Sequence, residues 1–192
     1  MAIKVLVTGS TGFLLRNVLH NYNWELIKYE PDHEYDNIDL VLHFGSPSDS
    51  FDFQFKSIMA VSMIDTTIGM AKQAQRNNCK MIFASSMAAV YLEDEYGIYK
   101  RAMEQYIHAL VDNHVIMRIP RVYDSDRKKG LMKKIANGHI RRDEWDKKIE
   151  YITIADFSKW FDDILIECGI QYYNGQLRSN TIKEIKEIFC EF

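Results

Sequence analysis

The chain has 192 residues, of which 47% are hydrophobic, 24 are Lys or Arg and 27 are Asp or Glu. This length suits one compact domain, and the apolar fraction argues against intrinsic disorder. A net charge of −3 argues against a general nucleic-acid-binding protein, which carries a basic excess. No apolar run approaches the ~18 residues of a membrane span, and the first residues lack a signal-peptide layout. We therefore expect a cytoplasmic protein with no nucleic-acid or membrane partner.

Short β-branched runs alternate with helical patterns along the first two thirds of the chain. In chain order, the sequence predicts a strand at 3–8, a helix from 13 to about 22, strands at 24–29 and 39–44, a helix at about 53–77, a strand at 80–85, a helix from about 96 and a strand at 115–119. Strands that alternate with helices predict βαβ units and an α/β fold with a parallel sheet.

The pattern changes after about residue 126. Residues 127–148 hold nine Lys or Arg and three Asp or Glu. Residues 154–168 look helical, and a capping box at Thr181–Glu184 predicts a last amphipathic helix. We interpret residues 1–123 as a core and residues 124–192 as a small lobe packed on it. The three cysteines are far apart without a CxxC, and the histidines are scattered, so we expect neither disulfides nor a metal site.

A glycine turn joins the first predicted strand to the first helix. Gly9 permits a tight turn, Gly12 lets the backbone approach a pyrophosphate, and the first amides of the helix face the anion. The alternative is a glycine turn with no ligand. Leu15 stands where a third glycine would allow close packing, so we expect the helix to lie slightly further from its strand.

An acidic residue at the end of the second strand suits the ribose of adenosine. Glu30 is the candidate, and it favours NAD because its charge would repel the extra phosphate of NADP. The positive charge of Lys28 weakens this preference for NAD, so NADP is also compatible with the sequence. The alternative for Glu30 is a solvated loop carboxylate with no ligand.

Tyr96 and Lys100 are four residues apart, so on a helix they share one face with Cβ atoms ~5–6 Å apart. A neighbouring cation lowers the pKa of a tyrosine from its usual ~10. Tyr96 would then exchange a proton with a substrate hydroxyl while a nicotinamide exchanges hydride at the same carbon. The alternative is a half-buried tyrosine beside an extended lysine on an amphipathic helix.

Six stretches in chain order resemble the extended short-chain dehydrogenase/reductases, also called the NAD-dependent epimerase/dehydratase family. They are Val7–Arg16, Asp39–Gly45, Met59–Ala71, Met81–Tyr91, Tyr96–Glu104 and Met117–Tyr123, followed by a similar element at Ile152–Phe157. The resemblance implies a Rossmann-like doubly wound sheet with bound NAD(P) and a small C-terminal substrate-side lobe. It also implies a nucleotide-sugar substrate and a homodimer through the helices Phe53–Asn77 and Tyr96–Asp112.

The residues and the resemblance together predict a site. Its catalytic residues are Tyr96, Lys100 and Ser86. Its cofactor-binding residues are Gly9, Thr11, Gly12, Phe13, Leu14, Glu30, Phe44, Gly45, Ser85, Tyr96 and Lys100. The basic stretch lies where the family grips the diphosphate of its substrate, and Arg141 and Arg142 are predicted to bind it. A solvated charged face is the alternative for this stretch.

The chain departs from the family pattern at the predicted reaction centre. The position of the catalytic Ser or Thr falls on Met87, which cannot donate a hydrogen bond. Ser86 is adjacent, but neighbours on a strand point to opposite faces, so only a local bulge would re-aim it. Ala88 and Ala89 replace the Asp–Glu pair of the sugar 4,6-dehydratases, which excludes that reaction.

Three segments are shorter than the family pattern, and one of them is the part after Tyr123, which is far smaller than the family's substrate lobe. Eight residues separate Glu30 from Asp39, too few for the usual helix and strand, so the adenine pocket must be built differently. Four residues separate Tyr91 from Tyr96, and the acids among them are expected to cap the helix that follows.

Three functions fit the sequence. The first is an unusually small NAD(P)-dependent nucleotide-sugar epimerase or keto-reductase. The second is a catalytically impaired NAD(P)-binding sensor or partner subunit, and the third is a reductase of a small carbonyl compound. The intact Tyr96 and Lys100 favour catalysis, whereas Met87 and the short loops favour a binding protein.

Overall fold

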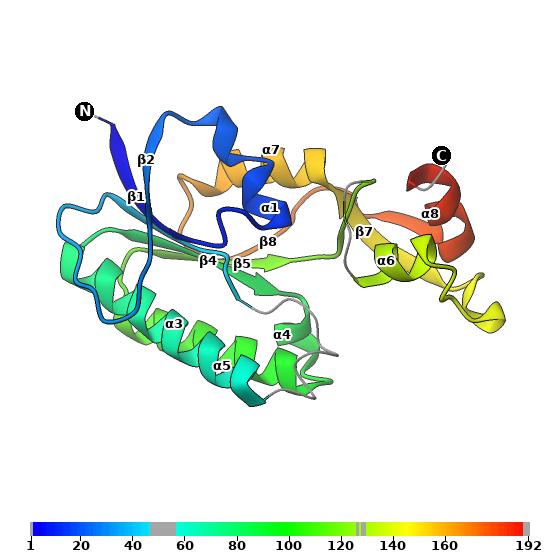
Figure 1. Cartoon of the computed structure of the whole chain (residues 1–192), viewed down its shortest axis with the longest axis horizontal. Coiled ribbons are helices and arrows are strands. Elements are labelled where there is room, and N and C mark those ends of the chain that lie inside the picture. The colour runs from blue at the N-terminus through cyan, green and yellow to red at the C-terminus, as the bar shows by residue number, and fades with distance from the viewer. Residues whose placement is uncertain (1, 47–56, 126, 128–129, 190–192) are drawn as a thin grey trace.

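A parallel sheet forms the centre of the molecule (Figure 1). The structure is a computed structural model and describes residues 2–46, 57–125, 127 and 130–189. Within these residues, six strands lie in the order β2-β1-β3-β4-β5-β8, and every neighbouring pair is parallel. Their bounds are β1 Ile3–Thr8, β2 Trp24–Lys28, β3 Leu40–His43, β4 Lys80–Ser86, β5 His114–Ile119 and β8 Gly169–Tyr172. The predicted Rossmann-like parallel sheet is confirmed.

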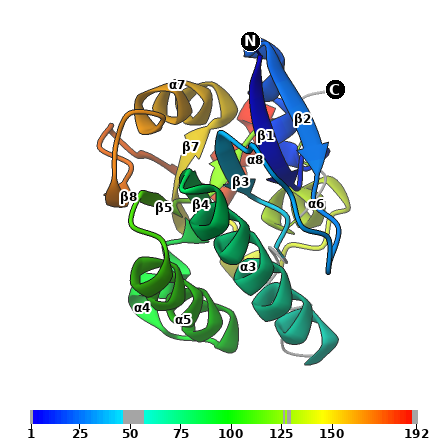
Figure 2. The same cartoon turned by 90° about the vertical axis from the view of Figure 1, so that its left-hand side faces the viewer.

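Helices cover both faces of this sheet (Figures 1 and 2). The helices α3 (Ser57–Asn77) and α5 (Glu95–Leu110) lie on one face, and α1 (Phe13–Arg16) and α7 (Ile154–Ile164) lie on the other. Every residue of β3 and β5 is buried, as expected for strands covered on both sides. The apolar runs that predicted these strands therefore form the core.

A smaller sheet lies beside the main one. It has the order β6-β7-β9, with β6 at Val122–Tyr123, β7 at Lys148–Thr153 and β9 at Arg178–Thr181. The helices α6 (Gly130–Ala136) and α8 (Ile182–Phe189) pack on it around a separate apolar cluster. The capping box that opens α8 is confirmed, because the amide of Glu184 donates to the Thr181 hydroxyl and Glu184 accepts from the Thr181 amide.

The expected division between residues 123 and 124 stays a prediction. Two elements that follow it, α7 and β8, lie with the main sheet, and the rest of the later chain builds the small lobe. The predicted helix start at Phe53, and Lys128 and Lys129 of the basic stretch, lie outside the described residues.

The first helix is shorter than predicted. The single helix expected from Phe13 to about residue 22 is wrong: α1 ends at Arg16, and a 3-10 turn, η1, follows at Leu19–Asn21. The side-chain amide of Asn17 donates to the Phe13 carbonyl at 2.6 Å, and the backbone amide of Asn17 donates to Leu14, three residues back. A polar side chain that bonds the local backbone in this way competes with a regular helix.

A loop replaces the missing helix and strand between β2 and β3, and α3 holds it in place. Gln73 accepts from the Tyr35 amide at 3.1 Å and donates to the His33 carbonyl at 2.9 Å. One turn later, Asn77 accepts from the Ile38 amide at 3.1 Å and donates to the Tyr35 carbonyl at 2.9 Å. Two amide side chains of one helix thus satisfy the backbone of a loop that has no ladder of its own.

The described part of the chain contains no helix that is both long and apolar enough to cross a membrane. Within the same residues, no three His, Cys, Asp or Glu side chains are grouped as metal ligands.

Candidate active site

Several of the predicted site residues gather at one edge of the main sheet. Gly9 follows β1, Gly45 follows β3, and Ser86 ends β4. These three strands are parallel neighbours, so their carboxyl ends meet at the same edge. This edge is where open α/β sheets bind ligands.

Gly9 and Gly45 pack backbone against backbone at this edge. Gly9 has φ of +74°, and a Cβ there would lie 2.6 Å from the Gly45 nitrogen. The turn is closed by a 2.9 Å hydrogen bond from the Gly12 amide to the Gly9 carbonyl. The amides of Phe13 and Leu14 then open α1 and have no acceptor within the helix. A turn that presents free amides at the carboxyl edge fits a dinucleotide phosphate, although α1 has only four residues.

A buried histidine ties the glycine turn to the neighbouring elements. His43 Nδ1 lies 2.7 Å from Thr8 Oγ1, and its Nε2 lies 2.8 Å from Thr67 Oγ1. The Thr67 hydroxyl donates to the Met63 carbonyl, so Nε2 carries the ring proton and Nδ1 accepts from Thr8. Burial lowers the pKa of His43 to about 3, which keeps the ring neutral. The Gly45 amide donates to the same Thr8 hydroxyl at 3.0 Å, and β1, β3 and α3 are thereby locked together.

Ser86 reaches Tyr96 although Met87 follows it directly in the sequence. Met87 has helical torsion angles, φ −58° and ψ −24°, and caps the short helix α4 (Ala88–Tyr91). The chain therefore leaves the strand at Ser86, whose hydroxyl accepts from the Ala88 amide at 3.2 Å and acts to lower the pKa of the Tyr96 phenol. The sequence analysis expected a local bulge to redirect Ser86, and a turn at Met87 stands at this point of the chain.

The helix that carries Tyr96 is capped as predicted. Asp94 is the N-cap of α5, and its carboxylate accepts from the Gly97 amide at 2.8 Å. Gly97 lies against α4, since a Cβ there would lie 2.4 Å from the Ala88 carbonyl oxygen. The short segment before α5 thus sets the position of Tyr96 relative to Ser86.

Lys100 is fully enclosed one turn after Tyr96. Its ammonium donates to the Ser46 hydroxyl at 2.5 Å and to the Ala84 carbonyl at 2.7 Å. It also lies 4.7 Å from the ring centroid of Phe83 and 5.8 Å from that of Tyr96. Burial lowers the pKa of Lys100 to about 7, although the charge of Glu104 raises it in part. Burial therefore favours the neutral amine of Lys100 compared with an exposed lysine.

The pKa of Tyr96 is raised, whereas the sequence analysis predicted that it would be lowered. Burial raises it to about 12, while the hydrogen bond from Ser86 and the charge of Arg127 act to lower it. The predicted lowering by Lys100 is wrong for this arrangement. The physical reason is that burial disfavours the phenolate. In addition, the Lys100 ammonium donates its hydrogen bonds to Ser46 and Ala84 and not to the phenol.

A buried ion-pair network lies behind Lys100. Arg118 donates to both Glu104 oxygens, at 3.1 and 2.6 Å, and both side chains are almost completely buried. Ser85 donates to the same carboxylate at 2.5 Å, so this predicted cofactor residue is held by Glu104. The Tyr172 hydroxyl bonds to Arg118 from β8. The network ties β4, α5, β5 and β8 together beneath the site.

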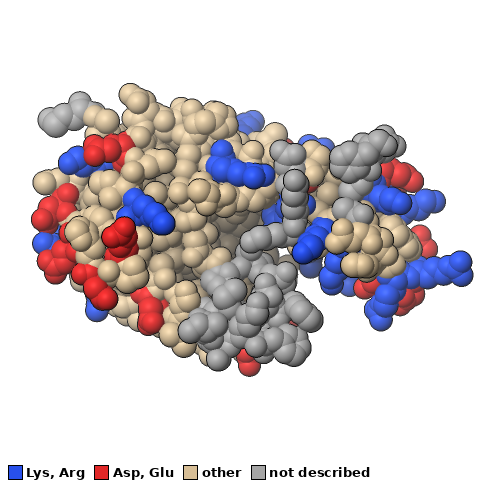
Figure 3. Space-filling model, viewed as in Figure 1, with Lys and Arg blue, Asp and Glu red and all other residues tan. Residues whose placement is uncertain are grey.

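The remaining predicted residues lie further apart. Glu30 is exposed at the end of β2, and its amide donates to the Tyr35 phenol at 2.8 Å. Phe44 packs its ring against Phe161 of α7, with centroids 5.9 Å apart. Arg141 and Arg142 are exposed in the 3-10 turn η2 (Arg142–Glu144) and at its N-cap, where Arg141 faces Glu144. Lys and Arg gather over the small lobe with acids among them (Figure 3).

Two site residues were missed by sequence reasoning. Ser46 bonds to Lys100, and its position directly after Gly45 was an available signal. Arg127 belongs to the basic stretch, but its guanidinium lies 5.1 Å from the Phe13 ring centroid, beside the glycine turn. Nothing in the spacing of charges distinguishes it from its exposed neighbours.

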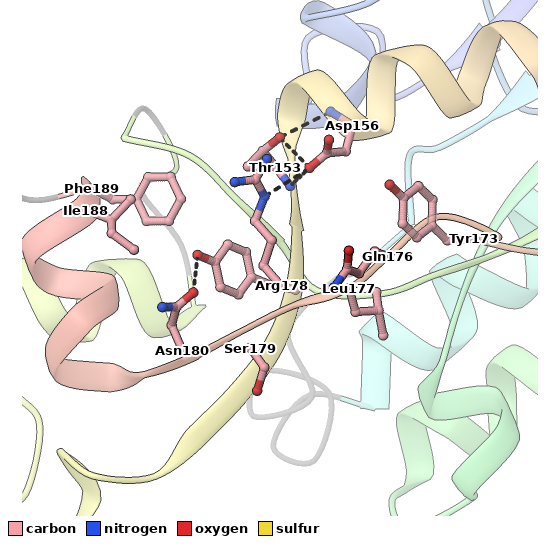
Figure 4. Close-up of a pocket in the computed structure, with 11 residues that line it drawn as sticks. Thr153, Asp156, Tyr173, Gln176, Leu177, Arg178, Ser179, Asn180, Ile188 and Phe189 are labelled. Carbon is pink, nitrogen blue, oxygen red and sulfur yellow. Dashed lines mark hydrogen bonds and ion pairs between the residues drawn. The ribbon is translucent and has the colours of Figure 1, made fainter.

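A pocket of about 750 Å³ opens in the small lobe (Figure 4). Side chains from β7, β9 and α8 line it, and Arg178 reaches Asp156 at its margin with an Nε to Oδ2 distance of 3.3 Å. Tyr96, Lys100 and Ser86 are not among its lining residues. The pocket is therefore separate from the cluster at the carboxyl edge of the sheet.

Comparisons with known proteins agree with this description of the fold. No protein-family model and no curated protein sequence matches the chain. Solved structures do match, among them a dTDP-4-dehydrorhamnose reductase from Bacillus anthracis in complex with NADP, with a TM-score of 0.74 and 14% identity over 98% of this chain and 81% of that one. A UDP-glucose 4-epimerase from Thermus thermophilus with NAD has a TM-score of 0.73 and 14% identity over 97% and 82%.

The enzyme WbmG from Bordetella bronchiseptica, in complex with NAD and UDP, matches with a TM-score of 0.70 and 16% identity over 100% of this chain and 80% of that one. Identities this low establish the fold alone. At that level the resemblance seen in the sequence is confirmed: this chain has the Rossmann-like fold of a dTDP-4-dehydrorhamnose reductase and a UDP-glucose 4-epimerase.

Proposed function

We propose that the chain is an NAD(P)-dependent epimerase or keto-reductase of nucleotide sugars, with Tyr96 as its acid/base. The observation that carries the proposal is the gathering of three groups at the carboxyl edge of the sheet: the Lys100 ammonium lies 5.8 Å from the Tyr96 ring, Ser86 acts to lower the pKa of the Tyr96 phenol, and Lys100 bonds to Ser46 directly after Gly45. A hydroxyl, a phenol and an ammonium at the carboxyl edge of a Rossmann-like sheet suit proton exchange with a carbonyl or alcohol.

Each residue has a distinct role in this proposal. NAD or NADP, when bound, supplies or accepts the hydride. Tyr96 gives a proton to the substrate oxygen or takes it, and Ser86 stabilises the phenolate by donating to it. Lys100 holds the nicotinamide ribose after releasing Ser46. The amides of the glycine turn bind the pyrophosphate, and Glu30 binds the adenosine ribose.

The test is transfer of deuterium from labelled NADH and NADPH to a panel of keto-sugar nucleotides and small ketones. Tyr96→Phe should lose activity by about 100-fold or more, since general acid–base catalysis contributes at least that much. Tyr106→Phe, on the same helix, is the matched control and should retain activity. Transfer to small ketones alone would assign the chain to reductases of small carbonyl compounds. Equal activity of wild type and Tyr96→Phe would refute the role of Tyr96.

One observation favours a second function, dinucleotide binding without turnover. The pKa of Tyr96 is raised to about 12 and the ammonium of Lys100 is bonded inside the protein, which disfavours the phenolate that would take a proton from an alcohol at neutral pH. In that case wild type and Tyr96→Phe bind NADH equally and neither transfers deuterium.

The proposal includes a homodimer formed through α3 and α5. Exposed apolar side chains on and beside these helices support it, namely Val61, Tyr91, Leu92 and Ile98. Light scattering after size-exclusion chromatography should give twice the mass of the chain. Ile98→Lys should then shift the protein towards the monomer, while Ile166→Lys, on the opposite side of the sheet, should not.

A further inference from the structure

Two histidines meet at the edge of the main sheet that lies opposite the candidate active site. His108 lies in the last turn of α5, and His114 is the first residue of β5. Residues 111–113 join the two elements. Because β5 runs parallel to β4, whose carboxyl end carries Ser86, the start of β5 lies at the amino edge of the sheet. The proposed function does not use this pair.

The hydrogen bond of His114 to the backbone fixes which of its ring nitrogens has a free lone pair. Its Nδ1 lies 2.6 Å from the Val111 carbonyl oxygen. A carbonyl oxygen only accepts, so Nδ1 carries the ring proton and Nε2 presents a lone pair. A histidine that binds a metal ion typically donates its other ring N–H to a carbonyl or carboxylate in this way. His114, which is 5% exposed, is therefore held in the tautomer and orientation of a metal ligand.

The nitrogen of the second histidine lies at the distance that a shared metal ion requires. His114 Nε2 lies 3.3 Å from His108 Nδ1, and the two ring planes make an angle of 83°. Two histidine nitrogens that bind one tetrahedral Zn²⁺ at ~2.0–2.1 Å each lie about 3.3–3.4 Å apart. The same distance allows His108 Nδ1 to donate to His114 Nε2. Because His108 is exposed, its ring proton can move to Nε2, and a cation can enter from the solvent.

The end of α5 adds an electrostatic attraction for a cation. The last carbonyl groups of an α-helix carry a partial negative charge, which favours cations in the last turn. His108 lies in that turn, and Val111, whose carbonyl orients His114, is the C-cap of the helix. A cation between the two rings is therefore close to this charge.

We propose that His108 and His114 bind one divalent transition-metal cation, such as Zn²⁺, with water completing its coordination. Imidazole nitrogens suit Zn²⁺, Ni²⁺ and Cu²⁺, whereas Mg²⁺ prefers oxygen ligands. No group of three His, Cys, Asp or Glu side chains suited to a metal occurs among the described residues, so we expect a site with open positions. The cation joins the end of α5 to the start of β5, and α5 is the helix that carries Tyr96 and Lys100.

This proposal departs from the expectation drawn from the sequence. The two histidines are six positions apart and match none of the common spacings of metal ligands. They meet only because the chain reverses direction between α5 and β5. The proposal is independent of the proposed function, since it concerns the opposite edge of the sheet.

The test measures binding of Zn²⁺, Ni²⁺ and Mg²⁺ by titration calorimetry, after chelator treatment, for the full-length wild type, His108→Ala, His114→Gln and His20→Ala. Wild type should bind one Zn²⁺ per chain and no measurable Mg²⁺. His108→Ala and His114→Gln should each weaken Zn²⁺ binding by at least ~10-fold, because loss of even an outer hydrogen bond to a metal ligand costs about 10- to 100-fold. His20, an exposed residue of η1, is the matched control, and His20→Ala should leave the dissociation constant unchanged.

Thermal unfolding gives a second measurement that does not depend on activity. Zn²⁺ should raise the unfolding temperature of wild type and of His20→Ala, because it binds the folded state, and should not raise that of His108→Ala. The exposed position of His108 makes this variant a test even if His114→Gln does not fold. Wild type that binds no Zn²⁺, or His108→Ala that binds it as tightly as wild type, would overturn the proposal. Absence of deuterium transfer would refute the proposed function and leave this site unaffected.

Discussion

Ser86 acts on the phenol of Tyr96 at the point where the chain turns, at Met87. The strand β4 ends at Ser86, and helical torsion angles at Met87 carry the backbone away from the sheet. The hydroxyl of this last strand residue, one position before the family pattern places it, thereby acts on the phenol. The methionine shapes the backbone, and the serine before it supplies the polar group.

This geometry predicts opposite results for two neighbouring residues. Ser86→Ala should lower the rate of deuterium transfer by about 10- to 100-fold, because a hydrogen bond to a charged group contributes ~1.5–3 kcal/mol. The pKa of Tyr96 should also rise further, so the pH–rate profile should shift to higher pH. Met87→Ala should change neither quantity by more than about twofold if Ser86 alone supplies the hydroxyl. A larger loss in Met87→Ala than in Ser86→Ala would contradict the assignment.

The buried ammonium of Lys100 predicts a pH dependence of stability. Its pKa in the folded protein, about 7, lies below its ordinary value of 10.5. Between these values the unfolded chain holds a proton that the folded protein has released, so raising the pH favours the folded state. Urea unfolding between pH 7.5 and 9.5 should give the wild type a slope up to about 1.4 kcal/mol per pH unit more positive than that of Lys100→Met. Parallel curves for the two proteins would show that Lys100 keeps an ordinary pKa.

Gly9 and Gly138 form a matched pair for testing the turn. Both have positive φ, +74° and +67°, but a Cβ at Gly9 meets the backbone of Gly45 whereas a Cβ at Gly138 meets nothing within 4 Å. Gly138→Ala should cost about 1–2 kcal/mol of unfolding free energy from the left-handed conformation alone. Gly9→Ala should cost clearly more, about 3 kcal/mol or above, and should weaken NADH binding. Equal losses in the two variants would argue against the close contact with Gly45.

The buried pair of Glu104 and Arg118 is expected to matter far more than a surface pair. Glu104→Gln leaves the Arg118 cation buried without its carboxylate and should cost about 3–5 kcal/mol. Glu34→Gln removes an ion pair with Arg76 that is largely exposed, so its effect should lie near the error of a denaturant titration. Similar midpoints for the two variants would mean that water reaches the Glu104 carboxylate.

The strands and long helices could be predicted because burial leaves a periodic pattern. The runs at β1, β3 and β5 are mostly apolar because helices cover both faces of the sheet. The strand β9 could not be predicted, because its residues Arg178–Thr181 are polar and lie at an edge. The early end of α1 escaped prediction for another reason: it depends on one side-chain hydrogen bond, from Asn17 to Phe13.

The site was predictable as a set of positions but not as a set of contacts. Spacing alone places Tyr96 and Lys100 on one helical face. It does not reveal that the Lys100 ammonium donates to Ser46 and Ala84, because these partners come from the loop after β3 and from β4. The direction of the Ser86 side chain likewise depends on the backbone torsion angles at Met87. The direction of the Arg127 side chain depends on the conformation of the loop after β6. Each is a tertiary property that a local pattern does not encode.

The loop held by Gln73 and Asn77 has a consequence for the behaviour of the protein in solution. With a loop in place of a helix and strand, β2 pairs on one side with β1 and presents its other row of backbone groups outwards. Such a row is a template for cross-molecular strand addition, which proteins discourage with charged side chains. Glu25 and Lys28 of β2 are exposed, so they act as gatekeepers against aggregation, and neutralising both would expose the chain to fibrous self-association.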